Sequence, residues 1–187
     1  MSQWFLYFLF YSLAGCGLEK LYARAIRSPR RQRKCFLLLP LCPVYGLAMT
    51  AVLALVPAEA GLVTLSVLGG LICTGVEYLV HLFYDRVLHV QFWDYSLLRG
   101  HVQGRICPRF AVIWGALSAL AVRWVQPAAA RLAGSVPPEA VFALWLLLAA
   151  DCVLTAALLA RHHDTALLGL GTLAAQARAS SQSSTSL

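Results

Sequence analysis

Long apolar segments separated by polar connections constrain this chain more than any other feature. Five of them occur, at about 3–22, 36–56, 61–84, 110–126 and 140–160. Each is within or close to the roughly 17–25 residues that cross ~30 Å of hydrocarbon. Only 12% of the residues are charged, against about 25% in soluble domains. The sequence therefore predicts an all-α fold: a polytopic membrane helical bundle of about five transmembrane helices.

The domain organisation follows from the same pattern. We expect one transmembrane helical domain over residues 1–176 and a disordered, Ser-rich tail over 177–187. The connection 85–109 is too long for a tight turn and mixes aromatic, aliphatic and charged residues. It is predicted to lie at the headgroup level or to fold back as a re-entrant loop.

The cations predict the orientation in the membrane. Six of the 15 Lys and Arg residues fall in the loop 24–34. Placing this loop in the cytoplasm gives twelve cations there and two on the other side, a strong bias under the positive-inside rule. The N-terminus is then outside and the C-terminus cytoplasmic. The net charge of +7 does not indicate nucleic-acid binding, because anionic headgroups of the lipid bilayer are the natural partners of such a loop.

Glu19 and Glu77 lie inside apolar segments, where a charge costs roughly 2.5–3.5 kcal/mol. With the predicted orientation, Glu19 and Glu77 both fall in the cytoplasmic third of the bundle. One interpretation has Glu19 at the headgroups, paired with Lys20 or the basic loop. The other has both acids facing the interior, where they bind a cation, share a proton or hold Arg105 between them.

The 85–109 connection carries two polar motifs. Asp94, between Trp93 and Tyr95, belongs either to an interface anchor or to the cap of a helix over 95–98. Arg105 follows Gly104, and its guanidinium can grip a carboxylate or a phosphate in bidentate fashion. A structural clamp onto Glu77 or Asp94 and binding of a substrate phosphate both stay open.

Two prolines, Pro40 and Pro43, precede Tyr45 and are expected to kink or unwind the start of the second segment. If the segment is unwound, its carbonyl groups need protein, water or an ion as partner. Asp151, midway along the fifth segment, is explained either by a Ser or Thr partner or by a second polar site.

Metal binding is not predicted, and no cofactor is assigned. His81 lies four residues after Glu77 and could join His101 or Cys107. The chain, however, contains neither HExxH nor CxxC spacing. Its six cysteines are dispersed and are typical of free thiols. A phosphate-binding loop and a nucleophile elbow are also missing from the sequence, so ATP hydrolysis by this chain alone is not expected.

Several short motifs occur together in a fixed order. They are Tyr11-Ser12-Leu13-Ala14-Gly15 with Glu19, Cys42-Pro43-Val44-Tyr45-Gly46, Glu77-Tyr78, Trp93-Asp94-Tyr95-Ser96, Gly104-Arg105-Ile106-Cys107 and Trp114-Gly115. This set, over about 11–127, resembles the CmpB-like "putative ABC-transporter type IV" permease family of bacteria, which has small vertebrate relatives. The resemblance implies an integral protein of the plasma (inner) membrane with five or six helices. The chain departs from the family at Leu39-Pro40, where Gly-Pro is usual, and at His101, where Asn is usual.

The leading functional hypothesis is a protein that binds or translocates a small solute or lipid through a polar cavity on the cytoplasmic side, as in a permease subunit. The predicted substrate-binding residues are Glu19, Tyr45, Glu77, Tyr78, Asp94, His101 and Arg105. The two Glu side chains would supply negative charge or a proton site, Arg105 the countercharge, and Asp94 would fix the loop. An ATPase or other partner chain and a homo-oligomer are the expected partners.

Two alternatives come from other classes of protein. A membrane-embedded enzyme acting on a lipid or lipid-linked substrate would use the same acids with His101 and Arg105. A structural or regulatory subunit would use the charges only to fasten the bundle. A headgroup-sized cavity favours the enzyme, a continuous polar path favours transport, and mutually paired charges without a cavity favour the structural role.

Overall fold

The computed structural model describes residues 2–26 and 35–162, and every regular element in these ranges is helical. The elements are α1 (Ser2–Ala25), α2 (Pro43–Leu55), α3 (Leu62–Phe83), η1 (Tyr84–Leu88), α4 (Pro108–Leu120), η2 (Ala121–Val125), α5 (Gln126–Ser135) and α6 (Pro138–His162). The elements η1 and η2 are π-helical turns that continue α3 and α4 without a break. The predicted all-α architecture is therefore confirmed.

Three helices of the described chain are long and apolar enough to cross a membrane: Leu62–Leu88, Pro108–Ser135 and Pro138–Arg161. They correspond to three of the five predicted segments. Helix α2 is apolar but has only 13 residues, or about 20 Å of length at 1.5 Å per residue. Helix α1 has 24 residues but is not among these three helices. The chain is thus a helical membrane protein, and its second segment departs from a full-length helix.

The two prolines explain this departure. The structure starts α2 at Pro43 rather than near residue 36, and residues 36–40 form a series of bends. Proline has no N–H to donate and is favoured in the first helical turn, so Pro43 can begin the helix while Pro40 stays outside it. The unwound stretch is held by Asp151 of α6, whose carboxylate accepts hydrogen bonds from the backbone N–H groups of Leu38 (3.3 Å) and Leu39 (3.1 Å).

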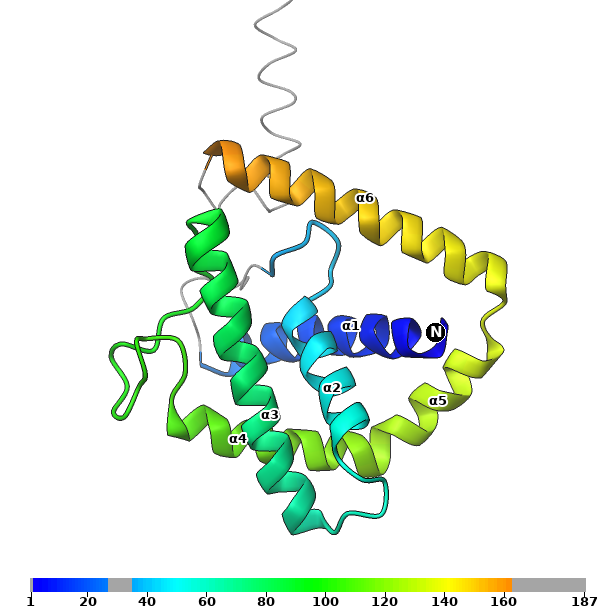
Figure 1. Cartoon of the computed structure of the whole chain (residues 1–187), viewed down its shortest axis with the longest axis horizontal. Coiled ribbons are helices and arrows are strands. Elements are labelled where there is room, and N and C mark those ends of the chain that lie inside the picture. The colour runs from blue at the N-terminus through cyan, green and yellow to red at the C-terminus, as the bar shows by residue number, and fades with distance from the viewer. Residues whose placement is uncertain (1, 27–34, 163–187) are drawn as a thin grey trace, which may run out of the picture.

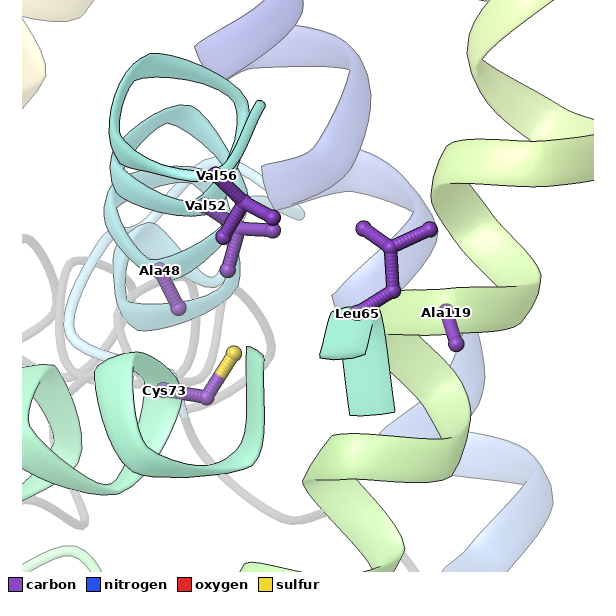
Figure 2. Close-up of a cluster of buried hydrophobic side chains, with 6 residues drawn as sticks. All are labelled: Ala48, Val52, Val56, Leu65, Cys73 and Ala119. Carbon is purple, nitrogen blue, oxygen red and sulfur yellow. The ribbon is translucent and has the colours of Figure 1, made fainter. Parts of the chain in front are cut away.

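The bundle is assembled mainly from α1 to α4. Helix α3 packs most extensively along α4, α1 packs along α2, and α2 also contacts α3. One buried apolar cluster joins three of these helices, with Ala48 and Val52 from α2, Val56 directly after α2, Leu65 and Cys73 from α3, and Ala119 from α4 (Figure 2). Small residues bring α3 close to α4: a Cβ added at Gly70 would lie 2.9 Å from the carbonyl oxygen of Ala111.

Helix α6 lies at the edge of this bundle. In Figure 1 it forms the upper border of the view, α1 and α2 lie below it, and α3 runs from the upper left to below α4. Most of α6 is exposed, but Asp151, Thr155 and Leu159, spaced four residues apart, form one buried face. Leu159 packs in a cluster with Tyr84 and Leu88 of η1. A narrow face thus docks α6 onto the rest of the chain.

The predicted 85–109 connection divides into two parts. Its first residues belong to η1, and His89 (φ 54°) ends the helix in the left-handed region. The remainder returns to α4 as a loop with one isolated bridge between Val102 and Ile106. The predicted tail, 177–187, lies outside the described residues, and the domain boundary at 176 stays a prediction.

Candidate functional site

Glu77 lies at the centre of a polar network inside the bundle. The residue is 5% exposed. The Tyr95 hydroxyl donates a hydrogen bond to Oε1 (2.8 Å), and the Trp114 indole N–H donates one to Oε2 (3.0 Å). Tyr95 is itself fixed by stacking on Phe110, with ring centroids 4.8 Å apart. The carboxylate of α3 is therefore satisfied by donors from the loop and from α4.

Glu19 reaches the same network from the other side. The Tyr45 hydroxyl of α2 donates a 2.7 Å hydrogen bond to Glu19 Oε1, and the Tyr45 ring meets Trp114 edge-on at 5.4 Å. Gly15 makes room for this ring, because a Cβ there would overlap it. The two predicted carboxylates are thus connected through Tyr45 and Trp114, and this network, which we call the carboxylate network, draws on α1, α2, α3 and α4.

Arg105 pairs with an acid that the sequence did not single out. Its guanidinium donates to Asp85 Oδ2 (2.7 Å) and to the side-chain oxygen of Gln103, and it lies 5.6 Å from the centre of the Tyr78 ring. The hydrogen bond to Asp85 raises the pKa of Arg105. The clamp onto Glu77 or Asp94, one of the two interpretations left open above, does not form. The loop returns to the C-terminal end of α3, about two turns beyond Glu77, and there it meets Asp85.

A tight turn positions Arg105. The Arg105 N–H donates to the Val102 carbonyl (3.0 Å), while Gln103 and Gly104 both have positive φ, 53° and 71°. Two positive φ values in the centre identify a type I′ turn, which favours glycine. Gly104 is required twice over, since a Cβ there would also lie 2.7 Å from Asp94 Oδ1.

Asp94 stabilises the loop locally. Its Oδ1 accepts from the Ser96 N–H and its Oδ2 from the Ser96 hydroxyl, both at 2.8 Å. These bonds, the backbone one first, lower the pKa of the Asp94 carboxyl. The segment after it is a turn rather than the helix considered from the sequence, so Asp94 caps a turn.

The histidines are separated by the fold. His101 is exposed, and its Nδ1 accepts a 3.0 Å hydrogen bond from the Gly104 N–H. His81 is buried and donates from Nε2 to the Trp93 carbonyl (3.0 Å). Across residues 2–26 and 35–162, no group of three or more His, Cys, Asp or Glu side chains is placed to hold a metal ion.

An open groove lies at the C-terminal end of α3. Its volume is about 530 Å³, in the range of small-molecule sites. Its lining includes four polar residues, Tyr78, Arg86, Gln103 and Arg105, which we call the polar wall. The four apolar lining residues, Leu79, Leu82, Phe83 and Val87, we call the apolar wall. We refer to it as the arginine groove.

The predicted site residues therefore separate into two neighbourhoods. Glu19, Tyr45 and Glu77 belong to the carboxylate network, whereas Tyr78 and Arg105 line the arginine groove. Asp94 and His101 shape the loop between them. Sequence reasoning missed Trp114, Tyr95, Asp85 and Gln103 as partners. Trp114 and Tyr95 stand in the ordered motifs and could have been weighed, but nothing local marks Asp85 as the partner of Arg105.

Comparisons with known proteins give one match. No curated protein and no solved structure matches the chain. The model of the family described as "putative ABC-transporter type IV" matches residues 6–156. The match extends beyond the 11–127 region of the sequence resemblance and takes in most of α6, including Asp151. Because the match covers most of the chain, this helical membrane protein belongs to the CmpB-like family, described as "putative ABC-transporter type IV".

Proposed function

We propose that this protein is a membrane-embedded subunit that binds or translocates a small solute or lipid, with the arginine groove as its entry site on the cytoplasmic side. The groove itself is the observation that carries the proposal. It offers N–H donors from Arg86 and Arg105 beside apolar side chains, a combination typical of ligand pockets. The family description supports a role in transport.

The orientation is part of this proposal. Twelve cations against two favour a cytoplasmic location for the loop 24–34 and for the end of α3. In Figure 1 the C-terminal ends of α1, α3 and α6 and the start of α4 all lie on the left, while the N-terminus and the α5–α6 turn lie on the right. An outside N-terminus and a cytoplasmic C-terminus are compatible with this arrangement, and the proposal includes a plasma-membrane location.

The proposal includes partner chains, because a transporter needs an energy source and a path across the membrane. The sequence contains no phosphate-binding loop, so ATP-driven transport would require a separate ATPase chain. The described part of the chain has three helices of full spanning length, which are few for a lone transporter. We therefore include a homo-oligomer in the proposal.

Native mass spectrometry of the full chain, purified in mild detergent from the membranes in which it is expressed, tests the proposal. We expect the wild type to retain a bound small molecule or lipid that Arg105→Ala loses. Arg109→Ala, an exposed arginine at the start of α4 that does not line the groove, is the matched control and should keep it. A folded wild type that carries no ligand under any mild condition would contradict the proposal.

A structural or regulatory role is the second candidate, and one observation favours it. Glu77 and Arg105 have protein partners for their charged groups, as expected of groups that fasten a bundle. Under this alternative Arg105→Ala would unfold the chain without releasing any ligand. The enzyme alternative is less supported, because His101 is exposed and is not among the residues that line the groove.

A further inference from the structure

The polar wall of the arginine groove includes N–H donors that are not used by protein acceptors of the described residues. Arg86 is exposed and has no hydrogen bond or ion pair to another described residue. Arg105 also lines the groove and is 8% exposed. A guanidinium presents several N–H donors in one plane, of which Asp85 and Gln103 occupy only part. Two arginines at one groove thus favour a ligand with several acceptor oxygens and negative charge.

A phosphate group matches this donor set. Guanidinium groups bind phosphate through parallel hydrogen bonds, and such bonds are stronger than those between neutral partners. Asp85 neutralises part of the charge of Arg105, but no carboxylate is among the residues that line the groove. The excess of one full cation, Arg86, remains available for the ligand.

The apolar wall continues as a stripe along α3. Leu79, Phe83 and Val87 are exposed by 63%, 50% and 58%. They are spaced four residues apart and therefore follow one face of the helix. They also lie in the last turns of the spanning segment Leu62–Leu88, where a membrane protein meets lipid acyl chains. A molecule bound at the two arginines would have this stripe directly beside it.

We propose that the arginine groove binds the phosphate headgroup of an anionic phospholipid, with Arg86 and Arg105 holding the phosphate and the stripe of Leu79, Phe83 and Val87 contacting an acyl chain. This inference rests on the proposed function and names the class of ligand. Free inorganic phosphate has the same headgroup chemistry, but it would leave the stripe without a partner. The lipid uses both walls of the groove.

Competition between two lipids tests the inference. The full chain is placed in nanodiscs that contain phosphatidic acid and phosphatidylcholine with identical acyl chains, and retained lipids are counted by native mass spectrometry. We expect preferential retention of phosphatidic acid by the wild type. Arg86→Gln should reduce that preference about fivefold, the effect of ~1 kcal/mol per basic residue. Arg99 is an exposed arginine of the loop between η1 and α4 and does not line the groove, so Arg99→Gln should leave the preference unchanged.

Two further arms separate the sources of phosphate and the two proposals. Inorganic phosphate is added as a competitor, and it should fail to displace phosphatidic acid. Val87→Ser should weaken retention of the lipid and keep the melting temperature. The inference is overturned if the wild type retains both lipids equally, or if inorganic phosphate displaces phosphatidic acid. It is also overturned if Arg86→Gln and Arg99→Gln lose the preference for phosphatidic acid to the same extent. If a native ligand other than a phospholipid is then lost in Arg105→Ala, the proposed function stands and only this inference fails.

Discussion

Glu77 has a hydrogen-bond donor on each of its carboxylate oxygens, Tyr95 on one and Trp114 on the other. An acid in a spanning helix is costly unless such donors replace its water. The donors are also costly to bury alone, because a buried hydroxyl or indole N–H without an acceptor has lost its hydrogen bond to water and gained none in return. At the scale of the single residue, the carboxylate network is therefore a mutual arrangement in which each group satisfies another.

Replacement of Glu77 should be destabilising in proportion to the acceptors removed. Glu77→Leu leaves Tyr95 and Trp114 without their partner, at about 1–3 kcal/mol for each buried donor. Glu77→Gln keeps one oxygen and should lose less. Thermal unfolding in detergent measures both, with Glu139→Gln on the exposed surface of α6 as the control. A Glu77→Leu protein as stable as the wild type would mean that the network contributes no net stability.

At the scale of the element, α3 is shaped by small residues on one side and by the π-turn η1 at its end. Gly70 lets α3 approach α4, since a Cβ there would also lie 3.3 Å from Gly115 Cα. A π-turn inserts an extra residue per turn and often marks a functional site. Here it rotates the end of α3, where Asp85 meets Arg105 and Arg86 borders the groove.

The glycines of α3 provide a test of this packing within one helix. Gly70→Ala should destabilise the protein by about 1–3 kcal/mol, because the new methyl group forces two backbones apart. Gly75→Ala adds the same methyl group where nothing lies within 4 Å. It should be neutral or stabilising by up to ~1 kcal/mol through helix propensity. The melting temperatures of the two variants test this prediction. Equal shifts in melting temperature would contradict close packing at Gly70.

At the scale of the whole molecule, Asp151 links α6 to the unwound residues before α2. Its carboxylate accepts two backbone N–H groups from that stretch, and the Thr155 hydroxyl lies 3.4 Å from Oδ1. The backbone donors left free by Pro40 thereby gain a partner at membrane depth, as they require. The role of Asp151 is thus to join two parts of the chain more than 100 residues apart in sequence.

Removal of this link should loosen the unwound stretch. In Asp151→Leu the N–H groups of Leu38 and Leu39 lose a charged acceptor worth about 1.5–3 kcal/mol, so their hydrogen exchange should accelerate about tenfold or more. Asp151→Asn keeps one oxygen and should show a smaller change. Glu139→Gln, also on α6, should leave exchange in 36–42 unaltered. Unchanged exchange in Asp151→Leu would show that α6 docks through its apolar contacts alone.

Local properties of the sequence determined the helical membrane architecture, the unwinding before α2 and the family. Hydropathy and the missing N–H of proline act over a few neighbouring residues. Their effects on local structure can therefore be predicted without knowledge of the tertiary contacts. The carboxylates Glu19 and Glu77 were also singled out, because an acid in an apolar segment is conspicuous. Only the tertiary structure decided their partners, the pairing of Arg105 with Asp85 and the docking of Asp151. Those contacts depend on how the helices are rotated against one another, and one π-turn is enough to change which side chains face each other.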